Sequence, residues 1–377
     1  MHILIINSEY PPIGGGASNA SAHIAKTLVG LGQRVTVMTS AFRGMKRTEE
    51  IEGVRILRLP ALRNKSDRSS TWEQVSFMLS ACLIGIWQVN RMRPDAALAF
   101  FGAPSGVAAW FWNLFFRLPY IVSLRGGDVP GFRPYDFARQ HRLLAPLLRR
   151  VWHRAATVVA NSEGLRQLGQ IFEPRIPVRV IPNGVDLEKF KPVSQRWDPP
   201  RLLFVGRVVY QKGLDLLLKA LAGLRDSPWE LEIVGDGPRV ERLKEQVAQL
   251  HLEKKVSFAG WLSRDGLPQA YQRANLFVYP SRHEGMPNAV LEAMASGLPV
   301  LATRIAGNED LVSEETGVLV PPEDVQALGA ALASLISNAS LRQQMGAAAR
   351  KQVEAQYSWR KVAQAYLDLM NSVVEIR

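Results

Sequence analysis

Apolar and polar residues alternate in two patterns along the first half of the chain. Short apolar runs, typical of buried strands, alternate with segments whose apolar residues recur every three or four positions, as in amphipathic helices. The runs that we interpret as strands cover residues 1–8, 33–40, 54–60, 96–100, 119–125, 156–162 and 178–184. A first helix is expected over residues 19–31, ended by Gly32. This alternation predicts a parallel, doubly wound α/β sheet.

The same alternation restarts in the second half of the chain. Strands are expected at residues 201–207, 229–237, 255–261, 274–281 and 297–303, with helices between them and after them. Between the two series, residues 182–200 are rich in turn-forming residues and contain three prolines after Asp186, which is typical of a linker. A chain of 377 residues is long enough for two domains of roughly 100–200 residues each.

The segment between two of these strands, residues 281–297, carries two glutamates at an informative spacing. Pro287 suits the first position of a helix, where its missing N–H is not needed, and Gly297 suits the stop after the last turn. A helix is therefore expected from Asn288 to residue 296. Glu284 lies in the loop before it, and Glu292 lies inside it, one turn beyond Asn288 and on the same face.

This helix start would combine N–H groups with a carboxylate on each side. N–H groups at a helix start bind phosphate, and carboxylates accept hydrogen bonds from hydroxyls. Ligands of doubly wound sheets bind at the carboxyl ends of the strands, where Glu284 is expected. A surface helix with two solvated acids would show the same spacing, but the flanking apolar strands favour a site for a ligand with both a diphosphate and sugar hydroxyls.

Three further loops carry candidate ligand-binding residues, each with a simpler alternative. The glycines at positions 14–16 follow the first strand and would let backbone N–H groups approach a phosphate, although they also fit a plain tight turn. Arg207 and Lys212 follow a strand and either bind a diphosphate or lie in solvent. Asp236 ends another strand and also suits a turn before glycine.

The composition argues against several other classes of protein. A single cysteine rules out an internal disulfide and fits a reducing compartment, and the six histidines show no metal-ligand spacing. There is no DxD pair to hold a divalent ion on a diphosphate, no GxSxG nucleophile elbow and no Walker lysine. The start, MHILIINSEY, lacks a basic region, so a first strand is expected there rather than a signal peptide.

Positive charge is concentrated in the first half. Residues 1–190 contain 24 Lys and Arg against 13 Asp and Glu, whereas residues 191–377 contain 22 against 21. The densest part, residues 133–154, has an apolar stripe at helical spacing and is either a basic amphipathic helix on anionic lipid or a surface helix packed on the sheet. No nucleic-acid partner is expected, because no reader motif accompanies the charge.

Two stretches without charge, residues 74–90 and 96–116, have about the length that a membrane-spanning helix needs. Gly102, Pro104 and Gly106 would break such a helix in the second stretch, so we expect a strand followed by a helix there and no membrane span. The aromatic run at residues 110–116 is either core or part of a surface for an acceptor carried on lipid.

Eight motifs, in this order, resemble the retaining glycosyltransferases of the GT-B fold (family 4). They are PPIGGGASN, RGGD, ANSEGL, IPNGVD, FVGRVVYQKG, VGDGP, EGMPNAVLE and AGNEDLV. The resemblance covers nearly the whole chain and is most specific in the second half. It implies the GT-B fold, two doubly wound Rossmann-like domains facing across a cleft. Residues 1–185 would bind the acceptor, with the helix at 358–377 packing back on them, and residues 195–357 would bind a nucleotide-sugar donor.

The resemblance also implies roles for individual residues. Glu292 would hold the ribose, Glu284 hydroxyls of the donor sugar, and Arg207 and Lys212 the diphosphate. The implied catalytic residues are Glu284, Arg207, Lys212, Arg125 and Asp128. The implied donor-binding residues are Gly15, Gly16, Arg207, Lys212, Gly235, Asp236, Gly260, Trp261, Glu284, Gly285, Met286, Pro287, Asn288, Ala289, Val290 and Glu292.

One position departs from the family pattern. Many members have a histidine where this chain has Arg125, the first residue of RGGD. A guanidinium stays protonated and cannot act as a general base, although it could bind a phosphate or orient an acceptor.

The expected activity is transfer of a sugar from a nucleoside diphosphate sugar, a UDP-sugar before GDP-mannose, to a hydroxyl acceptor with retention of the anomeric configuration. It would serve polysaccharide, glycolipid or other glycoconjugate biosynthesis, without a cofactor or a metal. A nucleotide-sugar epimerase, a pyridoxal phosphate-dependent phosphorylase and a non-catalytic nucleotide-sugar binding protein remain alternatives. A cytoplasmic location is expected, with peripheral contact to the anionic inner face of the membrane.

Overall fold

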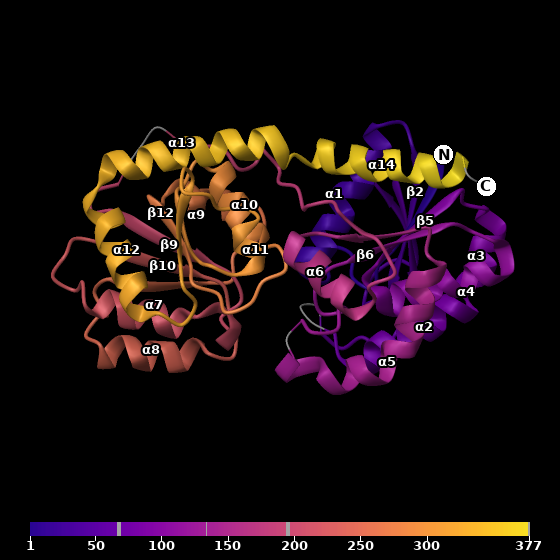
Figure 1. Ribbon diagram of the computed structural model, residues 1–377, viewed down its shortest axis with the longest axis horizontal. Coiled ribbons are helices and arrows are strands. Elements are labelled where there is room, and N and C mark those ends of the chain that lie inside the picture. Colours follow the sequence, from indigo (N-terminus) through magenta and orange to yellow (C-terminus); the bar gives the residue numbers. More distant parts are fainter. Residues whose placement is uncertain (66–68, 133, 194–196, 376–377) are drawn as a thin grey trace. The chain divides into compact units, whose positions relative to one another are not determined.

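The computed structural model describes residues 1–65, 69–132, 134–193 and 197–375. The chain divides into two compact units. One consists of Met1–Asn183 together with Trp359–Arg377, and the other of Gly184–Ser358. Figure 1 shows that each unit is a central sheet covered by helices.

The sheet of the first unit contains eight strands in the order β3-β4-β2-β1-β5-β6-β7-β8. Their bounds are β1 (His2–Ile6), β2 (Arg34–Ser40), β3 (Thr48–Ile51), β4 (Val54–Leu59), β5 (Ala96–Phe100), β6 (Tyr120–Leu124), β7 (Thr157–Ala160) and β8 (Val178–Val180). The predicted parallel, doubly wound sheet is confirmed, with one addition. The edge strand β3 pairs antiparallel with β4, and its largely exposed TEEI sequence has no apolar run that would have predicted it.

Helices cover both faces of this sheet (Figure 1). They are α1 (Gly16–Gly30), α2 (Thr71–Leu83), α3 (Gly85–Met92), α4 (Val107–Phe116), α5 (Pro134–Arg154), α6 (Glu163–Phe172) and α14 (Trp359–Glu375). α1 and α14 share one core with the sheet, and α2 to α6 share the other. α1 begins three residues before the expected start, because the hydroxyl of Ser18 donates to the carbonyl of Ile13 at 2.6 Å and stabilises a first turn that begins with glycine.

The apolar residues of α4 and α5 were expected either to pack in the core or to face lipid, and the structure shows buried and exposed apolar residues on both helices. Trp112 is fully buried, as are the α5 residues Val151 and Trp152, so much of both apolar stripes is core. In contrast, Leu143 is 81% exposed and Phe115 is 60% exposed. None of the helices among the described residues is both long enough and apolar enough to cross a membrane.

The second unit has a six-stranded parallel sheet in the order β11-β10-β9-β12-β13-β14. Its strands are β9 (Arg201–Val205), β10 (Glu230–Val234), β11 (Val256–Gly260), β12 (Leu276–Tyr279), β13 (Val300–Thr303) and β14 (Gly317–Val320). Its helices are α7 (Leu214–Ala222), α8 (Val240–Gln249), α9 (Leu267–Gln272), α10 (Asn288–Ala295), α11 (Ala306–Glu309), α12 (Val325–Ser337) and α13 (Ala339–Gln356), with a short 3-10 turn at Tyr210–Lys212.

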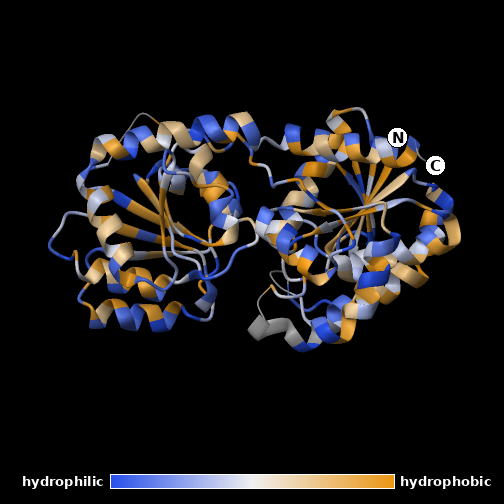
Figure 2. Cartoon of the chain, in the orientation of Figure 1, coloured by the Kyte–Doolittle hydropathy of each residue, from blue (hydrophilic) through white to orange (hydrophobic). Residues whose placement is uncertain are grey.

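Buried apolar strand residues form the core of this second unit. Figure 2 shows hydrophobic residues concentrated along the strands of each sheet. Val185 and Phe190, which lie in the stretch predicted as a linker, are buried in the core of this unit, and the Phe190 ring packs edge-on against Tyr271 at 5.5 Å. Residues 194–196 of that stretch lie outside the described residues.

Candidate functional site

The sheet of the second unit reverses its strand order between β9 and β12. β10 and β11 lie on one side of β9, and β12, β13 and β14 lie on the other. The loops that follow β9 and β12 leave the carboxyl edge of the sheet at this switch point, where doubly wound sheets bind their ligands. We call residues 206–213 and 280–287 the switch-point loops; they carry Arg207, Lys212 and Glu284.

Close backbone packing joins the two switch-point loops. Gly213 has a φ of +67°, and a Cβ at this position would lie 2.0 Å from the carbonyl oxygen of Pro280, so glycine is required here. The N–H of Arg282 donates to the carbonyl of Gln211 at 2.7 Å. The Gln211 side-chain amide donates in turn to the carbonyl of His283 at 2.5 Å.

The side chain of Arg282 clamps these loops together. Its guanidinium donates to both oxygens of Asp215 at 2.9 Å, to Glu323 at 2.5 Å and to the carbonyl of Tyr210 at 2.7 Å. Only 7% of the Arg282 side chain is exposed. Burial of Asp215 favours its protonated form, but the hydrogen bonds and charge of Arg282 outweigh burial and hold the pKa of Asp215 below its ordinary value.

Lys212 and Glu284 meet across the joined loops. The Lys212 Nζ lies 2.5 Å from Glu284 Oε1 and also donates to the Tyr279 hydroxyl at 2.5 Å. The two side chains are 13% and 10% exposed. An ammonium and a carboxylate thus stand together, largely shielded from water, at the switch point. Such a pair can interact with a departing phosphate and with hydroxyls of the attached group.

Arg207 and Asp236 lie at the same carboxyl edge of the second sheet, but they differ in their hydrogen-bond partners. Arg207 is exposed, and its guanidinium makes no hydrogen bond or ion pair with a described residue. Gly235 packs so closely against Gly206 that a Cβ would lie 1.9 Å from the Gly206 carbonyl oxygen. The exposed Asp236 accepts a hydrogen bond from the N–H of Gly237 at 2.7 Å, which agrees with the turn-forming alternative for this residue.

The helix predicted at residues 288–296 is α10, which begins at Asn288 and ends at Ala295. Pro287 is its N-cap residue, and no side chain caps its first turn. The predicted donor-binding run, 285–290, therefore consists of a loop followed by an uncapped helix start, whose N–H groups suit an anionic ligand. The Gly285 carbonyl lies so close to Gly307 that a Cβ there would be 2.4 Å away, so α11 packs directly on this loop.

Glu292 is half-buried on α10, one turn beyond its start. Its carboxylate accepts a hydrogen bond from the hydroxyl of Tyr271 at 2.8 Å. Burial raises the pKa of Glu292 to about 7, although the Tyr271 hydrogen bond and the charges of Arg264 and Lys189 act in the opposite direction. Glu292 therefore changes charge near neutral pH.

Gly260 and Trp261 end the neighbouring strand β11. The N–H of Gly235 donates to the Gly260 carbonyl at 2.7 Å, and the pairing of β10 with β11 shifts register at this point. Trp261 follows directly and is 74% exposed. A flat indole is thus available to stack on a planar ligand group at the carboxyl edge of the sheet.

In the first unit, the predicted glycine loop leads from β1 into α1. Gly14 has a φ of +94°, and a Cβ there would lie 2.7 Å from the Glu9 side chain, so the turn requires glycine. A Cβ at Gly15 would meet nothing within 4 Å, and Gly16 is the first residue of α1. Gly14 is thus explained by the turn, whereas Gly15 leaves open space at a helix start without a side-chain cap.

Asp128 organises the RGGD loop. It is 8% exposed, and its carboxylate accepts hydrogen bonds from the N–H groups of Gly102 at 2.8 Å, Arg125 at 3.0 Å and Gly126 at 3.1 Å. Burial raises the pKa of Asp128, and these three hydrogen bonds oppose that shift. All three donors are backbone groups, so the carboxylate fixes the path of the loop after β6 relative to the loop after β5.

Arg125 is held by residues from three distant parts of the sequence. Its Nη1 donates to Asn183 at 2.7 Å, its Nη2 donates to the hydroxyl of Tyr366 on α14 at 3.3 Å, and its guanidinium lies 4.2 Å from the centre of the Phe100 ring. None of the ion pairs among the described residues includes Arg125. The carboxylate of Asp128 is bound to the backbone N–H of Arg125, and its charge still favours the protonated guanidinium, although burial lowers the pKa of Arg125.

Several residues that shape these sites were missed by sequence reasoning: Tyr210, Asp215, Tyr271, Tyr279, Arg282, Asn183 and Tyr366. The two tyrosines nearest the carboxylates, Tyr271 and Tyr279, sit in apolar runs and look like core aromatics. A usable signal existed for Arg282, since it lies two residues before Glu284 in the same loop.

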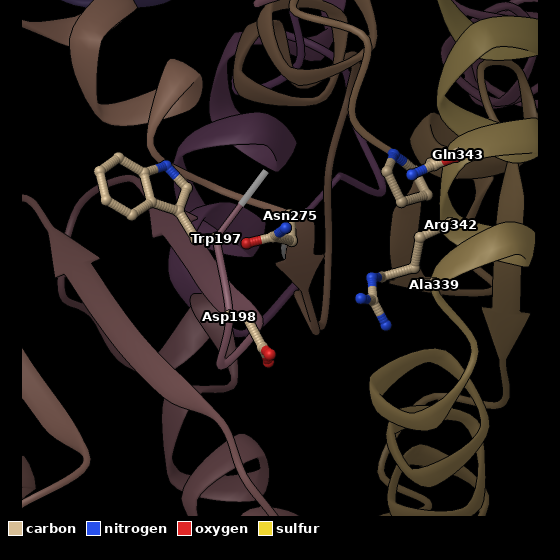
Figure 3. A pocket seen from close by; sticks show the side chains of 7 residues that line it. Trp197, Asp198, Asn275, Ala339, Arg342 and Gln343 are labelled. Atoms are coloured by element: carbon tan, nitrogen blue, oxygen red, sulfur yellow. The ribbon is translucent and has the colours of Figure 1, made fainter. Parts of the chain in front are cut away.

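A pocket of about 300 Å³ lies at the opposite, amino-terminal edge of the second sheet (Figure 3). Two of its lining residues immediately precede strands: Asn275 comes before β12 and Pro299 before β13. The full lining is Trp197, Asp198, Asn275, Pro299, Ala339, Arg342 and Gln343. The pocket is therefore separate from the switch-point loops.

No cluster of three or more His, Cys, Asp or Glu side chains able to hold a metal ion occurs in the described part of the chain. The charged groups of the switch-point loops are instead Arg207 and Lys212 on one loop, and Glu284 and the clamping Arg282 on the other.

Two family models match adjacent parts of the chain. The model described as "Glycosyl transferases group 1" matches residues 186–352, and the model described as "Glycosyl transferase 4-like domain" matches residues 15–184. Among solved structures, sucrose-phosphate synthase from Thermosynechococcus elongatus has a TM-score of 0.89 at 22% identity, over all of both chains. Anabaena HepE in complex with UDP and glucose has a TM-score of 0.79 at 20% identity, over 98% of this chain and 99% of that one.

Relatives are similar to this chain along nearly their whole length. The uncharacterized glycosyltransferase MJ1607 of Methanocaldococcus jannaschii is 26% identical over all of this chain and 99% of its own. Glycogen synthase of Mycobacterium tuberculosis is 26% identical over 97% of this chain and 93% of its own length. A GDP-mannose-dependent alpha-(1-6)-phosphatidylinositol monomannoside mannosyltransferase of the same organism is 26% identical over 98% of this chain and 97% of its own length.

The two sheets, the switch-point site and these matches define a glycosyltransferase with the GT-B fold that uses nucleotide sugars. The chain belongs to the glycosyl transferases group 1, the retaining family 4.

Proposed function

We propose that this enzyme transfers a sugar from a nucleoside diphosphate sugar to a hydroxyl of its acceptor with retention of the anomeric configuration. The observation that carries the proposal is the Lys212–Glu284 pair, 2.5 Å apart and largely buried at the switch point. This pair offers a cation for the departing diphosphate and a carboxylate for hydroxyls of the sugar that it leaves.

The neighbouring residues complete a donor site within the proposed donor domain, residues 195–357. Arg207, exposed and without a partner among the described residues, joins Lys212 on the diphosphate. The first turn of α10 binds diphosphate oxygens, and Glu292 accepts hydrogen bonds from the ribose. Trp261 and the backbone of Gly260 contact the base, supported by the exposure of the indole.

In the proposed reaction, the acceptor oxygen attacks the anomeric carbon on the face from which the diphosphate departs. The bond between that carbon and the diphosphate oxygen breaks as the new glycosidic bond forms. The leaving phosphate oxygen takes the acceptor's proton. The protein contributes positioning and stabilisation of the departing charge. Arg125 takes no part as a base, because its guanidinium remains protonated.

Donor choice is proposed as a UDP-sugar first and GDP-mannose second. A UDP-sugar is supported by the likeness to HepE, which was solved with UDP and glucose, and GDP-mannose by the similarity to the mycobacterial mannosyltransferase. The acceptor is a hydroxyl of a polysaccharide, glycolipid or other glycoconjugate. It binds to residues 1–185, on which α14 (Trp359–Glu375) packs.

A lipid-linked acceptor at the inner face of the membrane fits the positive charge of the first half of the chain. In this proposal the enzyme is cytoplasmic and touches the membrane peripherally.

The donor proposal is tested by thermal unfolding with a panel of nucleoside diphosphates. A ligand that binds only the folded protein raises the melting temperature, and UDP is expected to raise it most. Transfer is then measured with the matching nucleotide sugars across an acceptor panel. An isomerised sugar nucleotide formed without acceptor would favour an epimerase instead, and binding without turnover across the whole panel would favour a non-catalytic protein.

Transfer is expected to need no metal ion, because Arg207 and Lys212 supply the positive charge opposite the diphosphate. Activity in excess EDTA should equal activity in buffer, and added Mg²⁺ or Mn²⁺ should not raise it. Loss of activity in EDTA that a divalent ion restores would contradict this mechanism.

The affinity for the donor is expected to depend on pH through Glu292. The ionised carboxylate can accept hydrogen bonds from two ribose hydroxyls. The protonated form carries an O–H donor on one oxygen, so it accepts fewer hydrogen bonds from the ribose. The pKa of Glu292 is about 7, so the donor KM should rise several-fold as the pH falls from 8 to 6.

Two variants test this assignment. Glu292→Gln should give a weak donor affinity that does not change with pH in this range. Tyr271→Phe removes a hydrogen bond to the carboxylate, so the pKa of Glu292 should rise and the KM transition should move to higher pH. A Tyr271→Phe profile that overlays the wild type would contradict the assignment.

A further inference from the structure

Three helices of the first unit present large apolar side chains to solvent. These helices are α2, α3 and α4. We call six of these residues the apolar helix face: Trp72, Leu79, Leu83, Trp87, Leu114 and Phe115.

The apolar helix face is a surface shared by neighbouring elements. α2, α3 and α4 pack against one another, and their inward residues Phe77, Val89 and Trp112 belong to one buried core. Their outward residues therefore lie on the side of the same helix layer that faces away from the sheet. On α2, Trp72, Leu79 and Leu83 fall along one stripe of the helix.

The degree of exposure sets this face apart from ordinary surface. Trp72 is 80% exposed and Trp87 is 74% exposed, with Leu83 at 66% and Phe115 at 60%. Single exposed apolar residues are normal, but a group of large ones over adjoining helices marks an interaction surface. Tryptophan is enriched where a protein meets the boundary between lipid and water, because one part of its ring system is apolar and the other can donate a hydrogen bond.

The charges around the face indicate what covers it. Within α2, α3 and α4 the one acidic residue is Glu73, which is buried and caps α2 together with Ser70. Arg91, Arg93 and Arg117 are exposed at the ends of α3 and α4. The helices themselves carry no exposed carboxylate, and at their ends the three exposed arginines stand beside one exposed acid, Asp95. An apolar surface with this net positive border matches an anionic bilayer, whose acyl boundary is apolar and whose phosphates are negative.

We propose that the apolar helix face docks the enzyme on an anionic lipid bilayer. Trp72 and Trp87 lie at the level of the headgroups, and the bordering arginines contact lipid phosphates. This places the contact on α2, α3 and α4 rather than on the basic helix α5. Docking on a bilayer rests on the proposed use of a lipid-linked acceptor. Vesicle binding can be measured without donor or acceptor, so membrane docking and sugar transfer are tested separately, and either one can fail while the other holds.

The test is co-sedimentation of the full chain with vesicles of phosphatidylcholine and phosphatidylglycerol at roughly 2:1, and with vesicles of phosphatidylcholine alone. The wild type should bind the anionic vesicles at low salt and lose affinity as salt rises. The double variant Trp72→Ser/Trp87→Ser should lower the partition coefficient by about tenfold or more, since both residues lose apolar area buried in lipid. Trp261→Ser is the matched control, because Trp261 is also 74% exposed but lies in the second unit; it should bind vesicles like the wild type.

Three outcomes would overturn the proposal. The wild type could stay in the supernatant with anionic vesicles at low salt, or the double variant could bind as well as the wild type. Alternatively, the wild type could form a concentration-dependent dimer that the double variant does not form, in which case the face is an interface between copies of the chain. Equal melting temperatures of the variants and wild type establish that a loss of binding is not a loss of folding.

Discussion

Replacing Lys212 by alanine is expected to lower kcat by about 10²- to 10³-fold while changing the donor KM much less. The ammonium lies 2.5 Å from Glu284 and 2.5 Å from the Tyr279 hydroxyl, in a place where both charged side chains are largely shielded from water. A cation stabilises developing negative charge more strongly in such surroundings than in water. Its contribution should therefore appear as the diphosphate departs, and steady-state kinetics with saturating acceptor measures it.

Two further variants distinguish this effect from a general loss of charge. Lys219→Ala removes an exposed lysine of the nearby helix α7 and should leave kcat unchanged. Arg207→Ala should also lower kcat more than it raises KM, because the guanidinium is proposed to contact the same diphosphate. If Lys212→Ala raised KM and kept kcat, Lys212 would serve binding alone and the proposed role would be wrong.

Replacing Arg282 by methionine is expected to lower the free energy of unfolding by about 3–5 kcal/mol, the usual cost of removing one partner of a buried ion pair. The substitution leaves the Asp215 carboxylate without its two hydrogen bonds at 2.9 Å and the carbonyl of Tyr210 without its donor. Urea unfolding measures the loss. The two switch-point loops also lose their clamp, so kcat should fall at temperatures well below the melting point.

Arg304→Met is the matched control for this prediction. Arg304 is 56% exposed and lies 4.0 Å from Glu309, so its loss should change stability by no more than about 0.5 kcal/mol. The pH dependence gives a second readout. Arg282 holds the pKa of Asp215 below its ordinary value, so this stabilisation is present above the unfolded pKa of about 3.9 and is lost as the pH falls below it. The difference between wild type and Arg282→Met should therefore narrow in acid; a difference that stays constant would contradict the role of Asp215.

The strands and the central helix of the site could be predicted because their signals are local. An apolar run bounded by turn residues identifies a parallel strand wherever it lies, and Pro287 and Gly297 bound α10 to within one residue of its observed end. The strand β3 could not be predicted in this way, since TEEI has no apolar pattern and forms only by pairing with β4.

The surroundings of residues that contact distant parts of the chain were harder to predict from sequence. Arg125 was singled out for its chemistry, but its contacts with Asn183 and Tyr366 span 58 and 241 positions of sequence. Glu292 was expected to bind hydroxyls, yet its raised pKa depends on burial beneath neighbouring elements, and Tyr271, which opposes the shift, lies on α9. Burial is a property of the packed unit and leaves no mark on the residue itself.

By itself, the order of apolar runs and turn residues determined the two doubly wound sheets, the helix start at Asn288 and the residue types available for binding a diphosphate. Only the tertiary structure decided which of these residues meet. Lys212 and Glu284 are 72 positions apart and come together because β9 and β12 are neighbours at the point where the strand order reverses, and because Gly213 allows the two loops to touch. Strand order is set by the packing of the whole sheet, which no single stretch of sequence specifies.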